Sequence, residues 1–132
     1  MTPEKQEELV NKYPKVFSIV KHFECADGWY DIIDCLCANI ENILKNKMYK
    51  MTEDEKTDNQ VIAVQVKEKF GGLRFYIDHT DFDEIYGAIS MSESISRRTC
   101  ENCGNKGHKQ PGGWIRTLCD SCQMAQTTRK LT

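Results

Sequence analysis

Two pairs of cysteines near the C-terminus have the spacing of a metal site. Cys100 and Cys103 form one pair and Cys119 and Cys122 the other; two residues separate the members of each pair, and fifteen residues separate the pairs. A C-x2-C turn lets two sulfurs reach one ion, and two such turns supply the four ligands of tetrahedral Zn²⁺. Gly104 permits the left-handed turn that aims backbone amides at the thiolates. We predict one Zn²⁺ at these four cysteines.

Four protein ligands close the coordination sphere, so we expect a structural role for the ion. Residues 99–122 are rich in glycine and poor in apolar side chains, and metal binding replaces the hydrophobic core that this segment lacks. His108 is an alternative to one of the thiolates. The competing interpretations are four incidental cysteines or a redox-active dithiol pair.

The other three cysteines call for a different explanation. Cys35 and Cys37 would point about 200° apart on a helix and cannot easily share one ion. We expect Cys25, Cys35 and Cys37 to be buried or half-buried thiols that act as small apolar side chains.

Basic and aromatic side chains give a second candidate site, for a ligand. Alternating positions around Gly71-Gly72 place charge and an aromatic ring opposite an apolar stripe, and a second group lies in the cysteine-rich segment. The candidate contacts are Lys69, Arg74, Tyr76, Trp114 and Arg116. The alternative is a solvated sheet face of the ordinary kind.

An acidic cluster is the one candidate for catalysis. Asp78, Asp81 and Asp83 could hold a divalent cation, as in hydrolytic nucleases. Acidic residues are also favoured where a strand leads into a helix, because they cap it and complement its dipole. We expect capping and predict that the chain is not an enzyme.

Charge is divided unevenly along the chain. The 132 residues have a net charge of -2, but residues 97–132 hold seven basic and two acidic side chains, and the first 96 hold eleven basic and eighteen acidic. The basic end gives a nucleic-acid-binding regulator as an alternative function, although the acidic remainder would repel a long polyanion. The sequence shows neither the pattern of a signal peptide near Met1 nor an apolar run long enough to cross a bilayer. We therefore expect a cytoplasmic protein with no membrane partner.

The elements that must position these residues follow from hydrophobic periodicity. We predict helices over residues 4–12, from an Asp27 cap to Lys47, and over 82–97, with a surface loop over 52–60. From Val61 the period becomes two, which predicts a hairpin turning at Gly71-Gly72 with one buried face. The residues expected on that face are Ile62, Val64, Val66, Phe70, Leu73, Phe75 and Ile77. The expected inward stripe of the last helix is Ile85, Ala88, Ile89, Ser92 and Ile95.

The predicted fold class is α+β, with two main helices packed on a β-hairpin or small antiparallel sheet. A four-cysteine zinc ribbon follows at the C-terminal side. We place the core domain in residues 1–98 and the zinc-ribbon module in residues 99–132.

Two motif blocks carry a resemblance to a known group of proteins. The blocks are Lys69-Phe-Gly-Gly-Leu-Arg-Phe-Tyr76 and the cysteine pairs with Gly113-Trp-Ile-Arg-Thr-Leu118 before the second pair. Over residues 25–122 the chain resembles small proteins of bacteriophages and prophages with a zinc-ribbon-like tail and no assigned reaction. The resemblance implies an accessory protein in the cytoplasm of a bacterial host. Such a protein would bind a host protein or a nucleotide-type ligand, with counter-defence by inhibition or sequestration as one form of that role.

Overall fold

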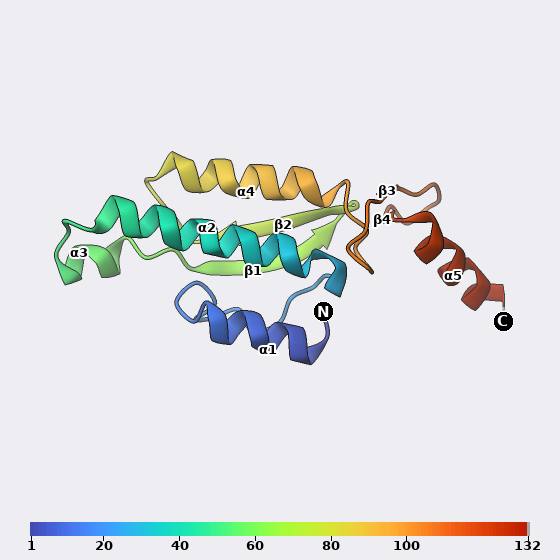
Figure 1. The fold of residues 1–132 in the computed structure, drawn as a ribbon, viewed down its shortest axis with the longest axis horizontal. Coiled ribbons are helices and arrows are strands. Elements are labelled where there is room, and N and C mark those ends of the chain that lie inside the picture. The colour runs from blue at the N-terminus through green and yellow to red at the C-terminus, as the bar shows by residue number, and fades with distance from the viewer. Residues whose placement is uncertain (132) are drawn as a thin grey trace.

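The computed structural model describes the backbone of residues 1–131 and the side chains of residues 1–127. Helices α2 (Tyr30–Met48) and α4 (Asp83–Ser96) lie along a hairpin of β1 (Ala63–Lys69) and β2 (Gly72–Ile77). Helix α1 (Pro3–Lys12) lies beside α2, away from α4 (Figure 1). The short α3 (Glu53–Asp58) is at one end of the molecule, and β3 (His108–Lys109), β4 (Thr117–Leu118) and α5 (Asp120–Leu131) are at the other. The predicted α+β class, with two main helices on a small antiparallel sheet, is confirmed.

The two N-terminal helices begin in different ways. The Thr2 hydroxyl caps α1 by accepting from the Lys5 amide, and Tyr13 ends it, as expected from Tyr13-Pro14. The expected Asp27 cap of α2 is wrong. Asp27 opens a 3-10 turn, η1 (Asp27–Trp29), and its carboxylate accepts from the Thr2 amide at 2.8 Å instead.

The expected loop over residues 52–60 is also wrong, because α3 forms there. The Thr52 hydroxyl accepts from the Glu55 amide, and three acidic side chains occupy the first turn of the helix. Capping and the helix dipole therefore support α3 without a buried side chain, which is why no apolar period marks it.

The hairpin turns one residue earlier than predicted. Lys69 pairs with Gly72, so the two turn residues are Phe70 and Gly71. Both have positive φ, 53° and 82°, as a type I′ turn requires. A type I′ turn matches the twist of the two strands, which explains why the strands pair in this register and not in the one that a Gly71-Gly72 turn would give.

A β-bulge between Ala63 and Gln65 changes the predicted buried face. Ala63 and Val66 are both buried as a result, whereas Val64 and Phe70 are exposed. On β2, Leu73 and Phe75 are buried and Ile77 is half-buried, as the alternation predicted. Phe75 packs edge-on against Phe17, which also contacts Phe23.

Helix α4 closes the core with a slightly rotated stripe. Ile85 and Ile89 are buried as predicted, but Ile95 is exposed and Ser96 takes the inward position. The Ser96 hydroxyl donates to the Glu93 carbonyl and accepts from the Leu73 amide at 2.8 Å, which ties α4 to β2.

The cysteine-rich segment packs on the core through its backbone. The Gly28 amide donates to the Glu101 carbonyl at 2.6 Å, and the indole of Trp29 donates to the Thr99 carbonyl at 3.0 Å. On the other side, the Thr117 hydroxyl donates to the Gly71 carbonyl at 2.6 Å. The segment is therefore held between the start of α2 and the hairpin tip.

Candidate functional site

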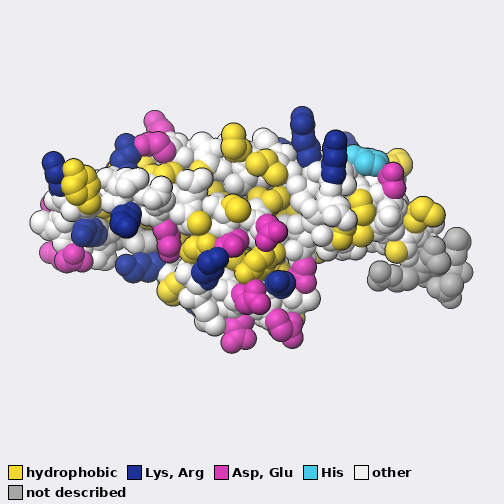
Figure 2. Space-filling view, in the orientation of Figure 1, with side chains coloured by type: hydrophobic (Ala, Val, Ile, Leu, Met, Phe, Trp, Pro, Cys, Tyr) yellow, Lys and Arg dark blue, Asp and Glu magenta, His cyan; other side chains and the backbone are white. Residues whose placement is uncertain are grey.

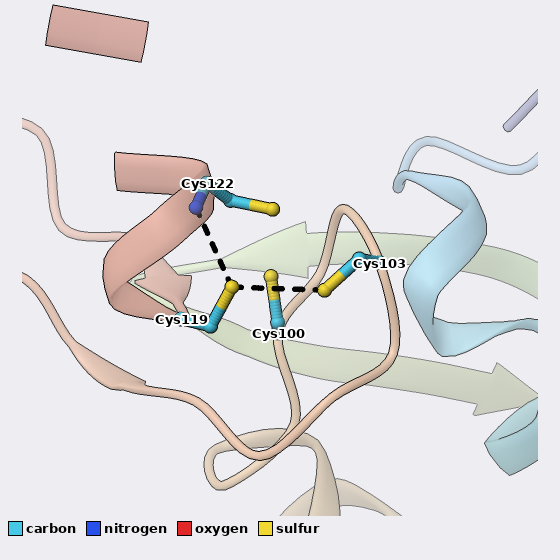
Figure 3. A group of neighbouring side chains, drawn as sticks. All are labelled: Cys100, Cys103, Cys119 and Cys122. Atoms are coloured by element: carbon cyan, nitrogen blue, oxygen red, sulfur yellow. Dashed lines mark hydrogen bonds between the residues drawn. The ribbon is translucent and has the colours of Figure 1, made fainter. Parts of the chain in front are cut away.

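The sulfurs of Cys100, Cys103, Cys119 and Cys122 converge at the junction of the knuckle loop and α5 (Figure 3). All four lie within 4.8 Å of one another, and the sulfurs of Cys103 and Cys119 are 3.6 Å apart. That distance is far too long for a disulfide bond of about 2.05 Å. In a tetrahedral site with metal–sulfur bonds of about 2.3 Å, the sulfurs are about 3.8 Å apart. The cluster is thus compatible with a metal site.

The first pair sits on a tight turn. The Cys100 amide donates to the Asn105 carbonyl and the Gly104 amide donates to the Cys100 carbonyl. Gly104 has φ 82°, the left-handed conformation predicted from its place after the second cysteine.

The second pair belongs to a helix and not to a second knuckle of a ribbon. Cys119 stands just before α5, its sulfur accepts from the Cys122 amide at 3.4 Å, and Cys122 lies in the first turn. The N-terminal end of a helix favours negative charge, so it suits thiolate ligands. A short hairpin of β3 and β4 precedes this pair, with His108 opposite Leu118.

The thiols of the cluster differ in how readily they ionise. Burial opposes ionisation of Cys100, yet amides of Cys119, Cys103 and Asn102 lower its pKa to about 7. Burial, followed by the neighbouring thiols, raises the pKa of Cys122 to about 12. Cys100 therefore ionises more readily than Cys122, and a metal would have to displace the proton of Cys122.

His108 does not join the cluster. Its Nε2 lies 2.8 Å from the Asp120 carboxylate, and this contact raises the pKa of the exposed imidazole. Among the described residues, the four cysteines are the one group of three or more potential ligands that comes together. Asp78 accepts from the Ile62 amide and Asp81 from His79, so the three aspartates do not form a cation site.

Two of the three remaining cysteines are core side chains, as expected. Cys25 and Cys37 are buried, and burial raises the pKa of Cys25 to about 12 and that of Cys37 still further. The prediction for Cys35 is wrong, because that side chain is exposed. Helical geometry turns position 35 outward when position 37 faces the core.

The predicted ligand residues are spread over different parts of the surface. Trp114 and Arg116 line a groove of about 480 Å³, and Tyr76 lines a separate hollow beside Val64 and His22. Lys69 and Arg74 line neither of these hollows. Arg116 is half-buried and pairs with the Glu101 carboxylate at 3.4 Å. The structure does not bring the five residues into one site.

The groove beside Trp114 contains acidic residues that the sequence did not single out. Three glutamates line the groove: Glu24, Glu68 and Glu101. The lining also includes three glutamines, Gln110, Gln123 and Gln126. Glu101 is only 5% exposed, and its two carboxylate oxygens accept from Arg116 and from the Ala26 amide. These glutamates come from three separate segments, and no local pattern connects them.

The surface charge follows the division along the chain only in part, because basic side chains also gather at the end of the molecule where α3 lies (Figure 2). Acidic side chains gather over α1 and the neighbouring part of α2, and basic side chains project near the end of α4 (Figure 2). Arg97, Arg98, Lys106 and Lys109 are exposed. Arg129 and Lys130, which contribute to the basic end of the sequence, have side chains outside the described part of the structure.

Comparison with known proteins gives no match among family models, curated proteins or solved structures. Within the described residues, no helix combines the length and apolar character needed to cross a membrane.

Proposed function

We propose that the four-cysteine cluster holds one structural Zn²⁺ and that the protein acts by binding a partner protein. The observation that carries the proposal is the donor set. Four thiol sulfurs lie within 4.8 Å of one another. Soft thiolates in a tetrahedral array suit zinc, and four protein ligands leave no position for a substrate. The ion would therefore stabilise residues 99–122 without taking part in a reaction.

The binding role is supported by the surface that the metal module helps to form. Trp114 is exposed in the loop between β3 and β4, and it lines the groove against residues of the core. A metal that orders this loop would fix the position of Trp114 for a partner. We propose a non-enzymatic accessory protein of a phage or prophage, with a host protein as its partner and counter-defence as the form of that role.

A nucleotide-type ligand is less well supported than a protein. The phosphates of a nucleotide would meet the carboxylates of Glu24, Glu68 and Glu101 in the groove, and Arg116 is already paired with Glu101. Like charges close together oppose binding.

Capture from bacterial lysate tests the binding role. We expect the zinc-loaded chain to retain a protein at physiological salt, and the same chain stripped with a chelator to lose it, because the loop that carries Trp114 is no longer held. Proteins are identified by mass spectrometry, and bound nucleotides are extracted in parallel. Recovery of nucleic acid with steep salt dependence, or of a nucleotide without a protein, would contradict the proposal.

A further inference from the structure

Two large aromatic side chains stand in solvent where the hairpin tip meets the C-terminal module. Phe70 is 70% exposed and Trp114 is 76% exposed. Both line one hollow of about 260 Å³, together with Glu68, Gly113 and Ile115. Single exposed hydrophobic residues are ordinary, but two aromatic side chains around one hollow indicate a binding site.

The backbone at Phe70 is unfavourable for its side chain. Among the described residues, Phe70 is the only one other than glycine with a positive φ, 53°. This turn position favours Asn, Asp or Gly, and a bulky residue there costs on the order of 1 kcal/mol. The turn is held because the Thr117 hydroxyl donates to the Gly71 carbonyl. Strain that the surrounding contacts maintain is typical of functional positions.

Negative charge dominates the groove next to these rings. Glu68 lines both the hollow with Phe70 and the adjoining groove of about 480 Å³, and Trp114 lies between them as a shared wall. Arg116 is the one cation in the groove lining and is paired with Glu101. Glu24 accepts from the Gln65 amide group and Glu68 from the Gly71 amide, and among the described residues neither forms an ion pair.

We propose that the hollow between Phe70 and Trp114, together with the groove that adjoins it, binds a cationic side chain, arginine or lysine, presented by a basic segment of the partner protein. The proposal rests on the protein-binding role proposed above and names the chemistry of the partner. A guanidinium or ammonium group is attracted to the face of the Trp114 indole and to the face of the Phe70 ring that is free of Lys69, whose ammonium lies 5.6 Å from the Phe70 ring centroid. Glu68 would accept its hydrogen bonds, and Glu24 would add to the attraction. The glutamates do not form a metal-ligand group, so an organic cation fits the site better than a metal ion.

The two tryptophans provide an internal reference for the test. Trp29 is fully buried, with its indole N–H donated to the Thr99 carbonyl, whereas Trp114 is exposed. In a ¹H–¹⁵N spectrum of the zinc-loaded full chain, each indole gives its own signal. N-acetyl-arginine amide and N-acetyl-lysine amide are titrated at millimolar concentrations. N-acetyl-citrulline amide serves as the neutral analogue of arginine, and guanosine monophosphate as the nucleotide probe.

We expect the two cationic amides to shift the Trp114 signal saturably, and the Trp29 signal to stay in place. Citrulline amide and guanosine monophosphate should shift neither signal. Phe70→Asn should weaken the arginine affinity by roughly fivefold, because it removes one aromatic wall. The variant should melt at the same temperature or higher, since Asn suits the positive φ. Lost binding would therefore not be due to unfolding.

Glu68→Gln tests the charge while keeping an oxygen for the Gly71 amide, and it should weaken the affinity to a similar degree. Glu55→Gln on the exposed α3, at the opposite end of the molecule from the hairpin tip, removes the same charge and should change nothing (Figure 1). Equal shifts with citrulline amide, an unmoved Trp114 signal, or full affinity in Phe70→Asn would overturn the groove inference. None of these outcomes would contradict the capture of a protein partner from lysate, so the protein-binding role would stand. A shift by guanosine monophosphate alone would overturn both proposals.

Discussion

Cys35 and Cys37 lie two residues apart on α2 and differ in burial, which controls the access of a reagent to a thiol. Cys37 is buried, and that burial raises its pKa, whereas Cys35 is exposed. Cys25 is buried as well, with its pKa raised to about 12. Because the thiolate is the reactive form, burial protects Cys25 and Cys37, whereas Cys35 is accessible to reagents.

This difference predicts a stepwise reaction with a thiol reagent. In the native zinc-loaded chain, one thiol should react quickly, and Cys35→Ser should remove that phase. A chelator that removes the metal should then make the cluster thiols reactive, because the Cys103 side chain is exposed and those of Cys119 and Cys122 are half-buried. Several fast thiols before chelation would show that the four-cysteine cluster is not protected by a metal. The reaction is followed by the absorbance of the released chromophore.

The 3-10 turn η1 packs closely against the first cysteine pair. A Cβ on Gly28 would lie 2.2 Å from the Cys100 carbonyl oxygen and 2.4 Å from that of Glu101. Backbone atoms cannot move away as a flexible side chain can. The hydrogen bond from the Gly28 amide to the Glu101 carbonyl would be lost together with this packing.

We therefore expect Gly28→Ala to destabilise the fold by about 3 kcal/mol or more and to weaken metal retention. Gly87→Ala is the matched control, because nothing lies within 4 Å of a Cβ built on Gly87. That change in α4 should be neutral or stabilising, since alanine is the better helix former. Thermal melting of both variants makes the comparison. Equal melting temperatures would show that the knuckle does not pack against η1 as described.

Sequence periodicity predicted the elements that bury an apolar face, and it failed where other forces decide. Helix α2 and the β2 alternation were readable because burial repeats at a regular interval. In β1, the bulge near Val64 reverses the alternation of buried and exposed side chains within one residue, and no local sequence signal marks the bulge. Helix α3 depends on the Thr52 cap and has no buried residue, and α5 begins at the second cysteine pair and has no core stripe among its described side chains. The clustering of the four cysteines was the most predictable feature, because C-x2-C spacing is itself a geometric constraint.

At the scale of the whole molecule, the candidate binding groove lies where three distant segments meet. Glu24 precedes α2, Glu68 and Phe70 lie at the hairpin tip, and Glu101 and Trp114 belong to the cysteine-rich segment. Contacts from Thr117 to Gly71 and from Glu101 to Ala26 hold these segments together. Such a surface cannot be read from any one stretch of sequence, because tertiary packing alone assembles it.

The same arrangement links metal binding to the groove. Cys103 and Cys119 lie at the two ends of residues 104–118, which include Trp114, so an ion at the four sulfurs would hold both ends of this segment. Loss of the ion would release residues 99–122, which contribute few side chains to the main hydrophobic core. Stability of this end of the molecule and the shape of the groove therefore depend on one site.

Metal analysis of the purified full chain tests the central claim most directly. Elemental analysis together with native mass spectrometry should find one zinc ion per chain, and replacement of Cys100 and Cys119 by serine should abolish it. Cys25→Ser and Cys35→Ser provide the matched controls and should keep the full zinc content. Less than about half an equivalent of zinc in the wild-type chain, with four freely titrating thiols in residues 99–122, would contradict the account.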